Sequence, residues 1–313
     1  MSVVMQTAIP GLTLTSQGGV HDVYALPQQK QLVVYTDRIT VSGKTLGVPI
    51  PYRGLMFSQI TLYWLNKGKE WLGLGHNVVT RAVERFPPEV QPYAAQLKGR
   101  SVLTQKLREL PLAFRVIGNL TGAEWQSYQE TRIVDGKSLP RGLRESDMLE
   151  KPIMIIEPKT SDIRKQDIGD MTKWTQRMFG LALYKQLEDI CLAMFGAARG
   201  YASRRGIIIA NTTFEFSVHE GTPYIINDVM TPESSTYWSA ADFKPGSPPQ
   251  PGWDRQPLLD WLIAQGWKKS QPLPEIPQDV IAEVSGRCRA IYDIMTGKIA
   301  LSKEEEEEKK MAV

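Results

Sequence analysis

The sequence predicts a β-rich first part followed by a larger part that mixes helices and strands. Strand-like patterns dominate residues 1–120, apolar residues recur at helical spacing over residues 170–204, and a second strand pattern follows at 207–226. We therefore expect an N-terminal β-rich lobe at 1–120, a C-terminal lobe of helices and strands at 121–300, and a charged tail at 301–313.

The first lobe is expected to contain a sheet and one helix. Alternating residues at 20–26 and 31–36 predict a hairpin, residues 53–66 read as a helix, and residues 101–118 predict further strands. This pattern is typical of a small sheet with its hydrophobic face covered.

The second lobe begins with a long helical pattern over 170–204. Its apolar stripe predicts an amphipathic helix that packs beneath the following strands, and it comprises Leu183, Leu187, Ile190, Met194 and Tyr201. Two more helices are predicted at 255–264 and 278–296, the second ended by Gly297.

A hairpin at 207–228 brings two carboxylates together. Residues 207–209 form an apolar run typical of a buried strand, and apolar residues then alternate with polar ones up to Ile226. Glu215 and Asp228 therefore fall on adjacent strands. Paired carboxylates are natural ligands for a divalent cation such as Mg²⁺; the alternative is that both are solvated charges on a strand face.

Composition narrows the class of protein. The chain has 313 residues, 42% hydrophobic and 23% charged, and its net charge is 37 − 34 = +3. Basic residues are dispersed, so we expect no nucleic-acid partner. No apolar run approaches the ~20 residues of a membrane span and the N-terminus lacks a signal-peptide pattern, so we expect a cytoplasmic protein with a small-molecule substrate and no membrane partner. Cys191 and Cys288 lie in helical patterns and are expected to be buried free thiols.

Several short motifs occur in a characteristic order. Besides the segments 205–216 and 226–238, they lie at 33–39, 50–60, 98–101, 120–122, 139–146 and 254–256. Each is weak alone, but the ordered set covers nearly the whole chain and resembles the SAICAR synthetase (phosphoribosylaminoimidazole-succinocarboxamide synthetase) family. The usual pattern of that family is Asp-x-Lys-Phe-Glu-Phe-Gly, then Asp-Glu-Val-Leu-Thr-Pro-Asp-Ser-Ser-Arg.

The resemblance implies a fold and a reaction. The implied fold is α+β, with an N-terminal β-rich lobe like that of protein kinases, a larger C-terminal α/β lobe and an active-site cleft between them. The implied reaction is that of an ATP- and Mg²⁺-dependent ligase, which activates a carboxylate as an acyl phosphate and joins it to the amine of aspartate.

On the nucleotide side, the chain departs from the family at charged positions. The family has a Gly-Lys-Val-Arg-Asp-Leu-Tyr turn, whose lysine and arginine reach the nucleotide phosphates; in this chain these two positions are Gly19 and His21. In the later hairpin, Asn211 and Thr213 replace an aspartate and a lysine of the family. A glycine offers only its backbone amide to a phosphate, so we expect weaker nucleotide binding.

The resemblance still supplies candidate nucleotide and metal ligands. The metal set would be Glu215, which is kept, with Asn227 and Asp228 in place of an aspartate and a glutamate; the loss of one formal charge predicts a weakened Mg²⁺ site. Lys159 matches a nucleotide-contacting lysine. The predicted cofactor-binding set is Thr104, Gln105, Lys159 and Glu215.

The catalytic candidates are His21, Lys159, Glu215 and Asp228. With an unperturbed pKa of about 6.5, a histidine facing the cleft could act as acid or base. The alternative is that His21 is a surface-turn residue without a role.

On the acceptor side, the family holds its ribonucleotide substrate with arginines and a serine. These fall on uncharged residues here, and the predicted substrate pocket comprises Ile117, Ala123, Ser234, Ser235, Thr236 and Leu259. Apolar replacement of phosphate-binding cations indicates a pocket adapted to a less charged ligand.

These departures lead to one interpretation and three alternatives. The interpretation is a repurposed enzyme of specialised metabolism that acts on an apolar or uncharged substrate, without a need for ATP. The alternatives are an ATP-dependent carboxylate-amine ligase with a changed acyl substrate, SAICAR synthetase itself, and a non-catalytic scaffold on the same fold.

Overall fold

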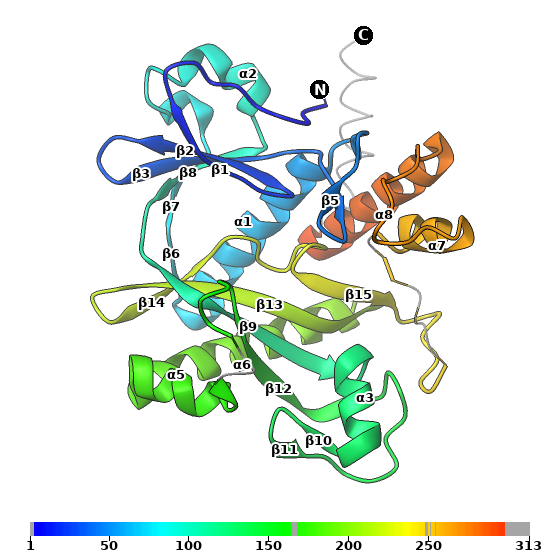
Figure 1. The fold of residues 1–313 in the computed structure, drawn as a ribbon. Helices are drawn as coiled ribbons and strands as arrows, with labels where there is room; N and C mark the ends of the chain where they lie inside the picture. The colour runs from blue at the N-terminus through cyan, green and yellow to red at the C-terminus, as the bar shows by residue number, and fades with distance from the viewer. Residues whose placement is uncertain (1–2, 165–167, 248–249, 251, 254, 298–313) are drawn as a thin grey trace. The chain divides into compact units, whose positions relative to one another are not determined.

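The computed structural model describes residues 3–164, 168–247, 250, 252–253 and 255–297 (Figure 1). The chain forms two compact units. The first comprises the described residues of 1–64, 77–106 and 254–313, and the second comprises 65–76 and the described residues of 107–253. This division differs from the expected bounds of 1–120 and 121–300, because residues after 254 belong with the first unit and β9 (Glu109–Asn119) with the second. The tail expected at 301–313 lies outside the described residues.

The first unit is built on a five-stranded antiparallel sheet. Its order is β1 (Thr13–Gln17), β2 (His21–Leu26), β3 (Lys30–Tyr35), β8 (Ser101–Gln105) and β7 (Val78–Thr80). Alternate residues of β3 enter two hydrophobic clusters, since Leu32 and Val34 pack into one while Val33 and Tyr35 pack into the other. The predicted hairpin is confirmed; its first strand starts one residue later than expected, and its second strand lies one residue earlier.

Helices and short elements complete the first unit. The predicted C-terminal helices are confirmed as α7 (Gln256–Ala264) and α8 (Gln278–Thr296), the latter ended by Gly297 in the left-handed conformation, φ 71°. Helix α1 (Arg53–Leu72) ends six residues later than predicted, and its residues up to Trp64 belong to this unit. The small elements are β4 (Thr40–Val41), β5 (Lys44–Thr45), α2 (Ala94–Leu97) and two 3₁₀ turns at Val83–Arg85 and Gln91–Tyr93.

Two buried ion pairs lie inside the first unit. Asp22 pairs with Arg38 at 2.8 Å, and Asp37 pairs with Arg100 at 3.0 Å. Asp37 also accepts hydrogen bonds from the backbone amides of Val4 and Gly54. Two of the sequence motifs, 33–39 and 98–101, therefore meet in a charged interior, where unpaired charges would be costly.

The second unit is built on a six-stranded sheet, in which five strands follow one another and the sixth pairs beside them. Its order is β12 (Met148–Pro158), β9 (Glu109–Asn119), β13 (Ile207–His219), β14 (Thr222–Ile226) and β6 (Gly75–His76), with β15 (Ser235–Ser239) paired to β13 (Figure 1). The predicted hairpin is confirmed as β13 and β14. The apolar run and the alternating run expected as separate strands form one strand of 13 residues.

Helices cover one face of this sheet. The single helix expected over 170–204 is two helices, α5 (Met171–Phe179) and α6 (Leu181–Ser203), because Gly180 adopts φ 87° and ψ 147° between them. Helix α6 contacts β13, β12 and β9. The unit also contains α3 (Gly122–Thr131) and the small hairpin β10 (Ile133–Val134) and β11 (Lys137–Ser138).

Two expectations about the fold are confirmed. The fold is of the α+β class, and both Cys191 and Cys288 are buried. Among the described helices, none combines the length and the apolar character that a membrane crossing requires.

Candidate active site

The candidate site lies on the face of the second sheet that points away from α6. Along β13, buried residues such as Phe214 and Phe216 alternate with partly exposed Asn211, Thr213 and Glu215. Strand pairing places Thr213 opposite Arg115 and Glu215 opposite Ala113 on β9. Because side chains of paired residues share a face, polar groups from several strands collect on this side.

Lys159 is the centre of the most compact charged cluster. It follows β12 directly, and its backbone N–H donates to Pro111 O on β9 at 3.0 Å. Its ammonium donates to Glu109 Oε2 at 2.8 Å and to Glu215 Oε2 at 2.6 Å. Asn227, directly after β14, donates its side-chain amide to the same oxygen of Glu215. We call Glu109, Lys159, Glu215 and Asn227 the lysine cluster.

The two carboxylates control the charge of Lys159. Burial by itself would lower the pKa of the ammonium, but hydrogen bonds and attraction from Glu109 and Glu215 outweigh it and raise the pKa above 10.5. Lys159 is therefore a fixed cation at neutral pH. A general-base role, which was open for this catalytic candidate, does not fit a lysine with a raised pKa.

Oxygen ligands for a divalent cation are present on this face. Glu215 offers a carboxylate, Asn227 an amide oxygen that a side-chain rotation would present, and Asp228 is the next residue in the chain and is half-buried. Within the described part of the chain, no three His, Cys, Asp or Glu side chains form a metal-binding group. The donor set fits Mg²⁺, which commonly takes only one or two protein carboxylates together with substrate phosphates.

The left-handed backbone at Asn227 also fits its residue type. Its φ is 59°, and asparagine and aspartate tolerate this conformation better than other non-glycine residues. Asparagine is therefore suited to the backbone conformation at this position.

A second ionic cluster lies beside the lysine cluster. Arg115 on β9 pairs with Glu124 on α3 at 2.5 Å and with Glu157 on β12 at 3.0 Å. Burial opposes the charged form of Arg115, but Glu124 and Glu157 outweigh it and raise its pKa. Two carboxylates neutralise this guanidinium, so it is poorly suited to bind an additional anion.

The predicted substrate residues of the second unit have different environments. Ile117 is 1% exposed and packs in a hydrophobic cluster with Leu120, Tyr128 and Ile153, so its side chain is part of the core. Ala123, by contrast, is exposed in the first turn of α3. The resemblance placed both in one pocket because they occupy positions where the family holds its substrate, and a motif match does not show which side chains are buried.

The residues of β15 and the turn before it are held by hydrogen bonds. Thr236 is paired with Asn211 and donates to its Oδ1 at 3.3 Å. Ser235 is buried and shares a 2.7 Å hydrogen bond with Thr212, and Ser234 caps the turn at Thr231. Ser235 thus joins β15 to β13, whereas Thr236 lies on the same face as the lysine cluster.

Four predicted residues belong to the first unit. The ring of His21 is partly buried and meets Tyr35 edge to face, with centroids 4.4 Å apart. Thr104 is buried on β8, and the backbone of Gln105 at the end of β8 bonds to Asn77 through both its N–H and its C=O. Leu259 on α7 packs against the hydrophobic cluster of this unit.

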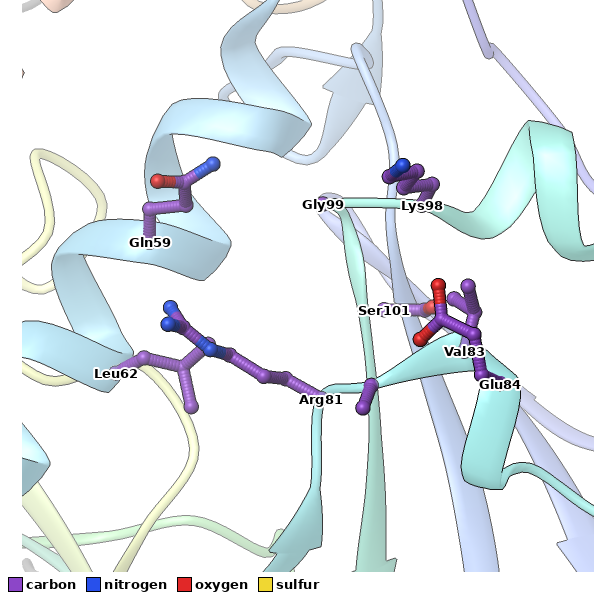
Figure 2. Close-up of a pocket in the computed structure, with 9 residues that line it drawn as sticks. Gln59, Leu62, Arg81, Val83, Glu84, Lys98, Gly99 and Ser101 are labelled. Atoms are coloured by element: carbon purple, nitrogen blue, oxygen red, sulfur yellow. The ribbon is translucent and has the colours of Figure 1, made fainter.

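The first unit also contains a surface pocket of about 260 Å³ (Figure 2). Gln59 and Leu62 on α1 face Lys98 and Glu84 across it, and Ser101 lies at its floor (Figure 2). Its lining, as far as the structure describes it, includes none of the predicted catalytic, cofactor-binding or substrate residues.

Sequence reasoning missed two charged residues of this face, Glu109 and Arg115. Glu109 is 50 positions from Lys159 and reaches it only through the pairing of β9 with β12. Arg115 could have been found from its position inside a strand pattern. Lysine and arginine are rarely buried on a strand unless they pair with an acidic residue.

Comparisons with known proteins agree with one another. The family model described as SAICAR synthetase matches residues 14–274. The chain is 34% identical over 293 residues to the phosphoribosylaminoimidazole-succinocarboxamide synthase of Maridesulfovibrio salexigens, covering 94% of this chain and 97% of the relative. It is 37% identical over 294 residues to that of Pelobacter propionicus, covering 94% and 98%. The structure of the SAICAR-synthase from Saccharomyces cerevisiae complexed with SAICAR matches with a TM-score of 0.84 at 28% identity, covering 94% and 98%.

These findings correct the functional interpretation made from the sequence. A repurposed enzyme for an apolar substrate is wrong, because relatives at 34–37% identity over almost the full length bear the name of the parent activity. Specialised metabolism and a divergent active site are likewise unsupported. The substitutions at individual sites weighed too heavily against the similarity of the whole chain. This chain belongs to the SAICAR synthetase family.

Proposed function

We propose that this protein is a phosphoribosylaminoimidazole-succinocarboxamide synthase. The name of the product identifies the two parts that are joined: the carboxyl group of a carboxyaminoimidazole ribotide and the amine of aspartate, which becomes the succinyl part of the amide. The observation that carries the proposal is full-length similarity to relatives of this one name, at 34–37% identity over 94% of the chain.

The lysine cluster supports nucleotide use. Bound Mg²⁺-ATP would supply the phosphoryl group that activates the carboxylate. Glu215 and Asn227 would hold the metal with Asp228 as a further oxygen donor, and the permanently charged Lys159 would hold a phosphate oxygen by a charge-assisted hydrogen bond. The hydrogen bonds that bring Lys159, Glu215 and Asn227 together, and the chemistry of these side chains, support the proposed roles.

The acceptor side predicts weak substrate affinity rather than loss of the reaction. Neutral Thr236 and Asn211 are hydrogen-bonded to one another where the family has an arginine and an aspartate. A neutral pair forms weaker bonds to a phosphate or carboxylate than a guanidinium does. We therefore expect a high KM for the ribotide.

Complementation tests the proposal in cells. A bacterial strain that lacks this synthase requires purines, and we expect the wild-type chain to restore growth without purines. The Glu215→Ala variant should fail, because it removes the carboxylate shared by Lys159 and Asn227. Glu130→Ala, at an exposed position of α3, is the matched control and should restore growth.

Failure of the wild-type chain to restore growth, when it is present in the cells as folded protein, would contradict the proposal. Release of ADP and phosphate together with formation of an amide, when the purified protein is given a different carboxylic acid and an amine, would then assign an amide ligase with a changed acyl substrate.

A further inference from the structure

Glu109 has no assigned role, yet it contacts the central cation of the candidate site. It is the first residue of β9, its side chain is 46% exposed, and its Oε2 lies 2.8 Å from Lys159 Nζ. The backbone of Lys159 is fixed nearby by the hydrogen bond to Pro111 O, two residues from Glu109. The contact is thus supported at both the backbone and the side chain.

Glu215 alone cannot hold Lys159 during nucleotide binding. Its Oε2 accepts hydrogen bonds from both Lys159 and Asn227. A cation that takes Glu215 as a ligand would compete for this oxygen and would repel the ammonium. Lys159 would then need another partner to remain in place.

We propose that Glu109 is a positioning residue that holds the ammonium of Lys159 beside the nucleotide site when Glu215 turns to the metal. This inference rests on the proposed nucleotide-dependent function. Glu109 touches neither the metal nor the reacting atoms; it acts through Lys159. The lysine cluster has two carboxylates for one ammonium, so the loss of one partner leaves the other in contact.

The arrangement explains why Lys159 has two acidic neighbours. A single glutamate would leave the lysine without a carboxylate partner whenever the metal is bound, and only the phosphate contact would then restrict the rotamers of its flexible four-carbon side chain. Glu109 limits this freedom.

Kinetics of Glu109→Gln test the positioning role. Glutamine keeps the size of the side chain but removes its charge, and it should raise the KM for Mg²⁺-ATP by about fivefold, the equivalent of one partly exposed ion pair, while kcat changes less. Glu130→Gln is the matched control, and neither variant should shift the thermal midpoint by more than about 2 °C.

Chemical labelling tests the same contact without nucleotide. In Glu109→Gln one carboxylate in place of two holds the amine of Lys159, so its acylation by an activated ester, followed by mass spectrometry, should be severalfold faster than in the wild type. The Glu130→Gln protein should label Lys159 at the wild-type rate.

The outcomes separate the inference from the proposed function. Unchanged labelling of Lys159 and an unchanged KM in Glu109→Gln would overturn the positioning role, whatever the reaction. Faster labelling together with a wild-type chain that binds no Mg²⁺-ATP would overturn the proposed nucleotide function and this role with it. Faster labelling together with a raised KM supports both.

Discussion

Asp22 is a buried carboxylate whose charge is balanced within the first unit. It pairs with Arg38 at 2.8 Å and accepts hydrogen bonds from the backbone and hydroxyl of Thr7. Burial favours the neutral acid, but these contacts together outweigh burial and lower the pKa of Asp22 below 3.8. A lowered folded-state pKa stabilises the fold above the unfolded pKa, and this contribution is lost as the pH falls through the folded-state value.

Asp22→Asn should therefore lower the free energy of unfolding and make it less dependent on pH in the acidic range. We expect the free energy of unfolding at pH 7 to fall by about 3 kcal/mol, because Arg38 keeps a buried charge without its carboxylate. Between pH 4 and pH 2, the wild type should lose stability more steeply than the variant. Denaturant unfolding at each pH measures both effects, with the exposed Asp242→Asn as control. Equal slopes for wild type and Asp22→Asn would contradict the account.

Thr236 offers a residue-scale test of the acceptor side. Its hydroxyl bonds to Asn211 on the face that carries the lysine cluster. Thr236→Arg restores the cation that the family pattern has at this position, and we expect the KM for the ribotide to fall about tenfold through a charge-assisted contact. Thr236→Met, of similar length without charge, should not lower it. A KM that falls equally in both variants would show that charge is not the cause.

At this scale the sequence predicted part of the site. Lys159, Glu215 and Asn227 were found because each lies in a recognisable motif, and the structure brings these three together. Glu109 could not be found, since its approach to Lys159 depends on the register of two strands. Ile117 was placed in the pocket, whereas α3 and its neighbours bury it.

Among the elements, the start of α1 depends on a close approach to β3. A Cβ atom on Gly54 would lie 2.5 Å from Tyr35 O, well inside van der Waals contact with backbone that cannot move freely. The Gly54 amide also donates to the buried carboxylate of Asp37. The segment 50–60 therefore needs glycine at this point to join the helix to the sheet.

Gly54→Ala should destabilise the protein by roughly 1–3 kcal/mol through overpacking. Gly196→Ala is the opposite control: this glycine is exposed within α6 with no atom within 4 Å of an added Cβ, and alanine should stabilise the helix by about 0.5–1 kcal/mol. The denaturant midpoints of the two variants should shift in opposite directions. A Gly54→Ala protein as stable as the wild type would show that the backbone can move to accept the methyl group.

The periodicity of apolar residues predicted where most helices and strands lie, but it did not predict where a helix is interrupted or which strands pair. The apolar stripe continues across Gly180, so one helix was expected where the backbone turns between α5 and α6. β9 was grouped with the first sheet because it follows β8 closely in sequence, yet it pairs with β12 and β13. Pairing between distant strands depends on the whole sheet, which local patterns do not record.

For the whole molecule, both the α+β class and the family could be predicted from the sequence. The ordered motifs identified the family because they extend over almost the full chain, as the relatives do. The functional interpretation failed because each lost cation was counted as evidence of a new substrate. Loss of single charges changes affinity, whereas relatives that are 34–37% identical over 94% of the chain share the name of one reaction.

The most direct test is the reaction itself with purified protein. With carboxyaminoimidazole ribotide, aspartate and Mg²⁺-ATP, we predict equal amounts of ADP and of the succinocarboxamide ribotide, measured by liquid chromatography and mass spectrometry. The Glu215→Ala variant should be slower by about 100-fold or more, as expected when a metal-site carboxylate is removed. Folded wild-type protein that yields neither ADP nor the amide at saturating substrates would contradict the account.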